Sequence, residues 1–309
     1  MMRFFSADET GVKPLRSAKP GCWIDAVSPT ADEITEVSRV AGIPEDLLKV
    51  PLDEDERPRT EKEGTVTILI VRVPTEENSG DISITTIPLG IFLTKKCIVT
   101  LALKESPPLN DLKNGTAKRF STKAKSKMVL RLLSRMNHHF LRYLNRIEKE
   151  VDKLEASLSR SFKNEEIVKL LNFQKTLVYF NNSILGNGQV IERIHKGAVL
   201  QLSGAEKEIL EDITIENQQA KETTKIFSDI LSNTMDAYVS IVSNNLNIVM
   251  KFLASITIIL SFPTMVASFY GMNVGLPLQE NPLAFLLTIL FSFFISITAA
   301  AIFWNRKWL

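Results

Sequence analysis

The sequence has little of what catalytic and metal-binding proteins use most. Only two cysteines and three histidines occur in 309 residues, a content that does not favour a histidine-rich zinc site. His138 and His139 are adjacent, so on a helix they point about 100° apart and do not close on one metal. No nucleophile motif, H-E-x-x-H or G-x-x-x-x-G-K-[ST] run is present. We therefore expect neither an enzyme nor a resident cofactor.

A surplus of charge of one sign is also missing. Lys and Arg number 37 against 35 Asp and Glu, a balance that suits a water-soluble domain and does not favour a nucleic-acid partner. The first residues, MMRFFSADE, contain no apolar core of signal-peptide length, so the large N-terminal part is expected to stay in the cytoplasm. There, Cys22 and Cys97 are expected to be buried small hydrophobic groups rather than a disulfide or metal pair.

Charged side chains are absent from two stretches near the C-terminus. No Asp, Glu, Lys or Arg lies between Lys251 and Glu280, or between Glu280 and Arg306. Each stretch supplies the about 20 consecutive apolar residues that a helix needs to cross a bilayer. The sequence therefore predicts a first span at 251–270, an external loop at 271–282, a second span at 283–304 and a basic tail at 305–309.

The basic residues around these spans predict their orientation. Lys251 precedes the first span, Arg306 and Lys307 follow the second, and the connecting loop has neither Lys nor Arg. The positive-inside rule places both termini in the cytoplasm and the loop outside. We expect a protein of the cell (inner) membrane that passes through the lipid bilayer twice.

Two regions precede the spans. Residues 1–121 mix short β-rich runs with short amphipathic helical ones, which predicts a cytoplasmic α/β domain. Residues 122–250 are rich in helix formers and predict a helical bundle and stalk. The expected helices are 128–163, 165 to about 186, and 205–251, the last without Gly or Pro and leading directly into the first span. The fold class expected is an α+β membrane protein with a long helical stalk and two C-terminal transmembrane helices.

Small and polar side chains follow one face of the predicted first span. Two helices cannot enclose a pore, so ion passage would require several copies around an axis, with the stalk as an assembly surface. The residues at steps of three and four are Asn247, Met250, Ala254, Thr257, Ser261, Thr264 and Ser268, with Leu253 beside them. On this pattern alone, the face either lines a pore or tightens contacts between membrane helices.

The segment Tyr270, Gly271, Met272 and Asn273, directly after an apolar span, resembles the signature at the outer pore mouth of the CorA family of divalent-metal transporters. The layout is similar over the whole chain, and residues 235–309 are similar in recognisable sequence. The resemblance implies a funnel-shaped homopentamer whose first span lines the pore. It also implies magnesium as the transported ion and as a regulatory ligand.

Carried onto matching positions, the resemblance makes Asn273 a selectivity ring that contacts the hydrated ion through its water shell, with Gly271 and Met272 shaping the ring. It makes Asn247, Met250, Leu253, Ser261 and Thr264 pore-facing. Ser261 stands where relatives often carry an apolar residue, and Pro263 is displaced by one position. The constriction is therefore expected to differ in detail from that of relatives.

Regulation is expected through acidic residues. In the family, cytoplasmic magnesium bridges neighbouring subunits and closes the pore, and Asp212 occupies one such position. The acidic pair expected opposite Asp212 is replaced here by Lys49-Val50. We therefore consider Asp53 and Asp55, from the acidic cluster at 53–56, as substitutes. The alternative interpretation of that cluster is a solvated acidic turn.

Two other functions stay open. Relatives with the same signature move zinc, cobalt or nickel, some with proton coupling, although few His and Cys favour a hard, hydrated ion. A function of another class is a membrane-anchored sensor whose spans only hold a cytoplasmic domain in place. The polar face of the first span argues against a simple anchor.

Overall fold

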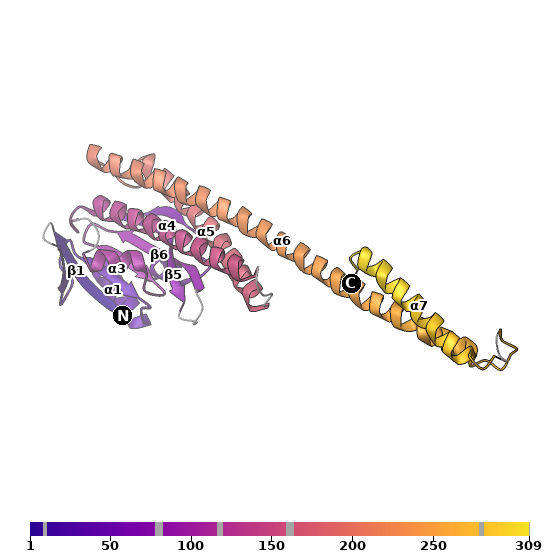
Figure 1. The fold of residues 1–309 in the computed structure, drawn as a ribbon. Helices are drawn as coiled ribbons and strands as arrows, with labels where there is room; N and C mark the ends of the chain where they lie inside the picture. Colours follow the sequence, from indigo (N-terminus) through magenta and orange to yellow (C-terminus); the bar gives the residue numbers. More distant parts are fainter. Residues whose placement is uncertain (9–10, 78–82, 116–119, 159–163, 278–280, 309) are drawn as a thin grey trace. The chain divides into compact units, whose positions relative to one another are not determined.

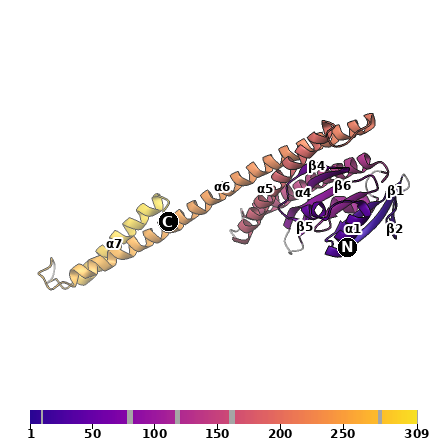
Figure 2. The same ribbon diagram turned by 180° about the vertical axis from the view of Figure 1, so that it is seen from behind.

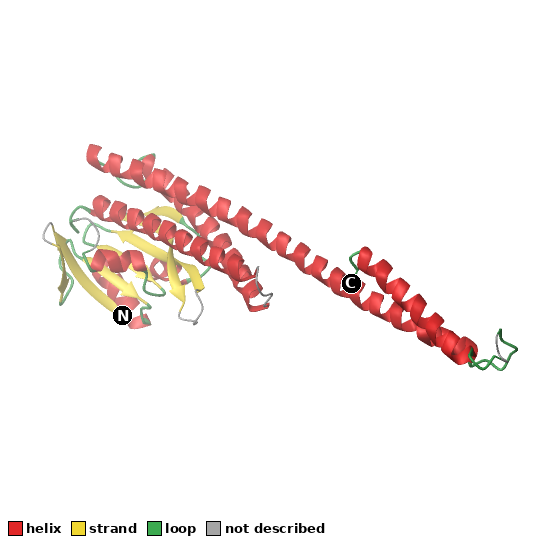
Figure 3. Cartoon of the chain, viewed as in Figure 1, coloured by secondary structure: helices red, strands yellow, loops and turns green. Residues whose placement is uncertain are grey.

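The structure is a computed structural model that describes residues 1–8, 11–77, 83–115, 120–158, 164–277 and 281–308. The chain divides into two compact units, Met1–Ser232 and Asn233–Leu309. The described strands all belong to the first unit, whereas the second is helical apart from its loops (Figure 3). Helix α6, Gly204–Tyr270, contributes to both units.

A seven-stranded sheet forms the first unit's centre (Figure 1). Among the described pairs of neighbouring strands in this sheet, only β3 and β7 are parallel, with Trp23 opposite Ile98. Short turns connect antiparallel strands, whereas the parallel pair requires the long crossover between β3 and β7. In spatial order the strands are β2 (Gly11–Leu15), β1 (Met2–Asp8), β3 (Trp23–Val27), β7 (Ile98–Ala102), β6 (Ser83–Leu93), β5 (Val66–Glu77) and β4 (Arg59–Glu63).

One face of the sheet is covered by α1 (Ala31–Ala41), α2 (Glu45–Lys49) and the short 3-10 helix η1 (Val50–Leu52). Helix α1 begins at a capping box, in which Thr30 and Glu33 each accept a backbone N–H from the other. Alternate strand residues point into this core, as a half-buried strand pattern predicts. Its strand and helix members include Ile24, Ala26, Ile34, Val37, Leu48, Ile68, Ile70, Phe92, Val99 and Leu101.

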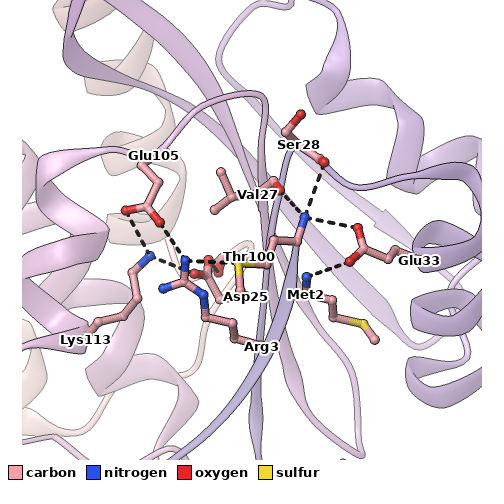
Figure 4. Close-up of polar contacts among 10 residues, drawn as sticks. Met2, Arg3, Asp25, Val27, Ser28, Glu33, Thr100, Glu105 and Lys113 are labelled. Carbon is pink, nitrogen blue, oxygen red and sulfur yellow. Dashed lines mark hydrogen bonds and ion pairs between the residues drawn. The ribbon is translucent and has the colours of Figure 1, made fainter.

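The opposite face of β3 and β7 carries a buried polar group. Asp25 is 1% exposed; its carboxylate accepts bonds from the Thr100 hydroxyl and from Lys113 Nζ, each at 2.8 Å (Figure 4). Lys113 ends α3, Pro107–Lys113. The Trp23 indole N–H in turn donates to the Thr100 hydroxyl oxygen. The buried charges are therefore paired and hydrogen-bonded, which such charges require to be tolerated in a protein interior.

Two long helices, α4 (Lys125–Leu158) and α5 (Asn164–His195), pack against β5 and β6 (Figure 2). Polar contacts fix α5 to these strands: the Thr176 hydroxyl donates to the Ile84 carbonyl oxygen at 3.0 Å, and the Ser183 hydroxyl to Thr86 Oγ1 at 2.9 Å. These helices confirm the predicted helical region. The predicted helix end at Lys163 lies outside the described residues.

Helix α5 runs further than the sequence predicts. We expected it to end near Gly186, yet it continues to His195. The glycines serve close packing instead. A Cβ at Gly186 would lie 2.7 Å from Pro58 Cγ, and one at Gly188 would lie 2.9 Å from Asn217 Oδ1. The cost of glycine within a helix, about 1 kcal/mol relative to alanine, is thus offset by contacts that no larger residue permits.

The second unit consists of the last part of α6 and helix α7, Ala284–Asn305, which lies alongside it (Figure 1). Both helices are long and apolar enough to cross a membrane, by length and composition. Helix α6 continues without interruption from Gly204 to Tyr270, so the predicted stalk and first span form one helix.

Candidate ion pathway

The predicted pore-lining residues lie on a face of α6 that α7 leaves uncovered. We call this face the seam; its members Asn247, Met250, Leu253, Thr257, Ser261, Thr264 and Ser268 are all exposed in the single chain. The side of α6 toward α7 instead carries Ser255, which is fully buried, and the half-buried Ile259 and Val266. The seam is therefore free to face other copies or an aqueous axis.

The hydroxyl groups of the seam are oriented by the helix itself. Thr257 Oγ1 donates to the Leu253 carbonyl oxygen at 2.8 Å, and Ser261 Oγ donates to the Ile258 carbonyl oxygen at 2.7 Å. Thr264 Oγ1 makes the same kind of bond to its own helix at 3.3 Å. A hydroxyl has one proton and two acceptor lone pairs. Once the proton is donated to the backbone, what the hydroxyl presents outward is acceptor oxygen.

A second set of small residues tightens the contact between α6 and α7. Ser255 on α6 and Ser292 and Ser296 on α7 are all less than 9% exposed. Small side chains allow two membrane helices to approach closely. The sequence pattern missed Ser255, because it stands two residues from Thr257 and outside the seam. The interpretation of close helix packing thus applies to the side of α6 toward α7, whereas pore lining by the seam stays a prediction.

Pro263 lies inside α6 and removes one helical hydrogen bond. A proline has no N–H, so the carbonyl four residues earlier, that of Ile259, loses its usual donor. Ser296 Oγ of α7 lies 3.4 Å from this carbonyl oxygen and 3.0 Å from that of Ser292, and its one proton is shared between them. Such side-chain donors are how proline is tolerated in membrane helices.

The signature segment forms the end of α6 and the start of the loop. Gly271 N–H donates to the Ala267 carbonyl oxygen at 3.0 Å, and Met272 N–H to that of Phe269 at 3.3 Å, closing the last turn. Asn273 follows and is exposed. Part of the predicted loop, residues 278–280, lies outside the described residues.

Within the single chain, glycine is not required at position 271. Gly271 does not have a positive φ, and a Cβ there would meet the Ala267 carbonyl oxygen at 3.4 Å, an ordinary contact. Any need for glycine must therefore come from what surrounds the loop. A neighbouring copy or a bound ion are the candidates.

The acidic residues proposed for regulation lie in the first unit. Asp212 is exposed on α6, one turn before Glu216, whose pKa is raised by burial and by the charge of Asp212. Asp53 and Asp55 are exposed in a turn where Asp53 Oδ1 accepts the Asp55 N–H at 3.0 Å. In the described part of the chain, no group of three or more His, Cys, Asp or Glu side chains is placed to hold a metal ion.

That acidic turn is held by an arginine. Arg72 Nη1 donates to the Glu54 carbonyl oxygen at 2.8 Å and to the Glu56 carbonyl oxygen at 3.0 Å. The backbone of the turn is thus fixed while the carboxylates of Asp53 and Asp55 remain exposed.

Comparison with known proteins gives one consistent result. The family model described as CorA-like Mg2+ transporter protein matches residues 19–307. The chain is 28% identical over 297 residues to the cobalt/magnesium transport protein CorA of Methanocaldococcus jannaschii, covering 93% of this chain and 91% of that protein. The protein of the same name from Thermotoga maritima is 24% identical over 275 residues, covering 87% and 78% respectively.

Solved structures are similar over the whole length. The complete structure of the CorA magnesium transporter from Methanocaldococcus jannaschii has a TM-score of 0.86 at 24% identity, covering 100% of this chain and 99% of that one. Full-length CmaX has a TM-score of 0.73 at 15% identity, covering 99% and 97%. These likenesses show the fold: an α/β domain, a long helix and two candidate transmembrane helices. Since the family model matches nearly the entire sequence, the chain belongs to the CorA-like Mg2+ transporter family.

Proposed function

We propose that this protein is a channel-type transporter that passes hydrated Mg2+ across the cell membrane, driven by the membrane potential. The observation that carries the proposal is the seam of α6, which α7 leaves uncovered and in which the hydroxyl groups of Thr257, Ser261 and Thr264 donate to their own helix and so keep acceptor lone pairs free. Several copies, a pentamer by family resemblance, would enclose an axis with five such seams. The names of the two relatives, cobalt/magnesium transport protein, support the same class of ion.

Selectivity is assigned to Asn273 at the outer mouth. Magnesium gives up its octahedral water shell reluctantly, so a channel selects it best by binding the hydrated ion. A ring of neutral amide oxygens accepts hydrogen bonds from that water without holding the charge too tightly for exit. Asn273 is exposed directly after the last turn of α6. A ring at this position would meet the ion at the external end of the helix.

Met250 and Leu253 are the residues to which we assign closure of the pore. These side chains are 60% and 56% exposed in the single chain and lie on the seam beside polar Asn247. Around an axis they would form an apolar collar, which stops ions by losing its water. A small separation of the helices at this level would allow water and ions to pass.

The driving force is sufficient without nucleotide hydrolysis. Moving one charge across 100 mV is worth about 2.3 kcal/mol, so Mg2+ gains about 4.6 kcal/mol per 100 mV on entering a negative interior. Lys251 precedes the apolar part of α6, and Arg306 and Lys307 follow α7, which supports cytoplasmic termini. Residues 1–121 and 122–250 are then the cytoplasmic α/β domain and the bundle with its stalk, and cytoplasmic Mg2+ would act there, between subunits, through Asp212 with Asp53 or Asp55.

Cobalt is the competing cargo that a specific observation favours, because both curated relatives carry it in their names. Zinc and nickel remain alternatives of the same class. An anchored sensor is disfavoured by the polar residues of the seam, because a helix that only faced lipid gains nothing from Asn, Thr and Ser side chains on one face.

The proposal is tested by Mg2+ entry into proteoliposomes, with and without an inside-negative potential. Asn273→Ala is compared with Asn281→Ala, a matched loop asparagine whose Oδ1 accepts the Leu283 N–H just before α7. Potential-driven Mg2+ entry that is lost in the first variant and kept in the second supports the proposal. Proton-linked Zn2+ entry without Mg2+ entry moves the protein to the zinc-transporting relatives, and no flux of any ion supports the anchored sensor.

A further inference from the structure

The two cysteines, far apart in sequence, are neighbours in the sheet. The parallel register begins with Trp23 opposite Ile98, and the Ile98 N–H donates to the Cys22 carbonyl oxygen at 3.0 Å. Continued back by one residue, this register places Cys22 beside Cys97. Both side chains belong to the core cluster that contains Ile24, so they point to the same face. The expectation of two buried, free thiols is confirmed. Their proximity could not be expected from the sequence.

The spacing of the two residues suits a covalent link. Neighbouring strands lie about 4.8 Å apart, and disulfides join Cα atoms about 4.4 to 6.8 Å apart. Cys22 and Cys97 each stand immediately before their strands, β3 and β7. At a strand end, the backbone adjusts more readily than in the middle of a ladder, which allows the closer approach that a sulfur–sulfur bond needs.

Both thiols adjoin turns at the surface. Cys22 N–H donates to the Lys19 carbonyl oxygen at 3.0 Å, and Cys97 N–H donates to Thr94 Oγ1 at 3.1 Å, so each cysteine closes a tight turn. Lys95 and Lys96 in the second turn are exposed. Each cysteine residue is 2% exposed, so reagents reach its thiol when these turns open locally, the least costly kind of opening in a folded domain.

The surroundings distinguish the two thiols. Burial raises the pKa of both, which slows their reaction at neutral pH. Beside Cys97, the Thr94 hydroxyl lies 3.7 Å from Sγ, and Lys125 Nζ donates to the Lys95 carbonyl oxygen at 3.1 Å. The Thr94 hydroxyl and the positive charges of Lys125 and Lys96 favour the Cys97 thiolate, whereas the charge of Cys22 opposes it. Backbone hydrogen bonds favour the Cys22 thiolate. Because these positive side chains lie beside Cys97, we assign it the first attack.

We propose that Cys22 and Cys97 form a dithiol modification site that closes to a disulfide between β3 and β7 when a hydroperoxide reaches it. The Cys97 thiolate attacks the peroxide oxygen; the O–O bond breaks, a sulfenic acid forms, and the leaving hydroxide takes a proton to become water. The Cys22 sulfur then attacks the sulfenic sulfur, its proton leaves with the hydroxyl group as a second water, and the S–S bond forms. Two thiols lose two electrons and one hydrogen peroxide becomes two waters.

In the test, the full-length protein in detergent is treated with hydrogen peroxide and then denatured in N-ethylmaleimide, which alkylates the remaining free thiols. Mass spectrometry measures the mass of the product. The expected result is loss of both maleimide adducts together, with one crosslinked peptide pair containing Cys22 and Cys97 that reducing agent separates. The rate should rise roughly tenfold per pH unit between pH 7 and 8, because the thiolate fraction rises by that factor below the thiol pKa. Crosslinking should also raise the melting temperature, because it restricts the unfolded chain.

Single variants serve as controls. Cys22→Ala leaves Cys97 alone and should stop at a sulfenic acid that a dimedone probe labels, without an intramolecular crosslink. Cys97→Ala should react more slowly than Cys22→Ala under the same conditions. Two results overturn the proposal: wild-type protein in which both thiols remain fully alkylated after peroxide, or one in which they are oxidised independently to sulfinic acids without a crosslinked peptide. The wild-type measurement decides even if a variant does not fold.

Discussion

The side-chain amide of Asn187 pairs with both backbone groups of Arg72. Asn187 Oδ1 accepts the Arg72 N–H, and Asn187 Nδ2 donates to the Arg72 carbonyl oxygen, each at 2.8 Å. Strand β4 pairs with β5 only as far as Ile70. Asn187 therefore occupies the place of a strand partner where the edge of β5 would otherwise be open, and it joins α5 to the sheet.

Asn187→Ala should lower the free energy of unfolding by roughly 2 kcal/mol or more, because it leaves a buried N–H and a buried C=O without partners. Thermal denaturation of the full chain in detergent measures the change. Asn182→Ala, an exposed asparagine on the same helix, is the control and should change stability by less than about 0.5 kcal/mol. Equal effects of the two variants would contradict the role given to Asn187.

The contact between Ser296 and the Ile259 carbonyl should matter to the pairing of α6 and α7. Ser296→Ala removes the donor that serves the carbonyl opposite Pro263 and should cost about 0.6 to 1.7 kcal/mol. Unfolding in detergent micelles is a suitable measurement. Thr298→Val is the control, because Thr298 is exposed and bonds its own helix at Phe294; it should leave stability nearly unchanged.

The buried pair of Asp25 and Lys113 should show strong coupling. Lys113→Met alone leaves the Asp25 carboxylate, 1% exposed, without its cation and should cost about 3 to 5 kcal/mol. Adding Asp25→Leu removes that uncompensated charge, so the double variant should be more stable than Lys113→Met. A double-mutant cycle of melting temperatures measures this. Additive losses would mean that the pair is not a unit.

Stability should fall as the pH drops below about 6.5, partly through His139. Burial lowers the pKa of His139, although its bond to Asp111 at 2.8 Å opposes the shift. With Arg135 and His138 also nearby, the folded state binds fewer protons than the unfolded state. Stability is then complete above the unfolded pKa and is lost as the pH falls through it.

Melting temperatures measured from pH 8 to 5 test this sign. His139→Gln keeps a donor for Asp111 and should flatten the decline. The control is His195→Gln, which replaces an exposed histidine and should leave the decline unchanged. A decline of the same steepness in His139→Gln would assign it to other groups.

The seam makes a prediction for transport. Thr257→Val keeps the shape of the side chain but removes its acceptor oxygen, and it should reduce potential-driven Mg2+ entry severalfold if five copies face the axis. Thr298→Val makes the same chemical change on the exposed side of α7 and should not affect entry. Flux per reconstituted protein is the quantity to compare, and equal flux in the two variants would exclude Thr257 from the pathway.

Local patterns in the sequence were enough for some of this structure. Two uncharged stretches predicted both membrane helices, and the absence of Gly and Pro from 205–251 predicted one continuous helix. The predicted helix ends were less accurate, because glycine occurs both at helix ends and at close contacts within helices. Glycine ends many helices, yet Gly186 and Gly188 lie within α5, because Pro58 and Asn217 pack against them.

Features that depend on long-range pairing were not predictable. The neighbouring position of Cys22 and Cys97 follows from the register of β3 and β7, which no local pattern encodes. Likewise, the seam could be recognised by its helical spacing, whereas which small residues face α7 depends on how the two helices rotate against each other. Ser255 was missed for that reason.

The hydroxyl bonds of the seam also bear on which ions are kept out. Thr257, Ser261 and Thr264 donate their protons to carbonyl oxygens of α6, so in this arrangement they have no proton to offer chloride or phosphate. If the seam lines a pore as proposed, such a wall would disfavour anions through the direction of its hydroxyl dipoles. Charge discrimination would then require no carboxylate within the bilayer, where an ionised group is costly to place.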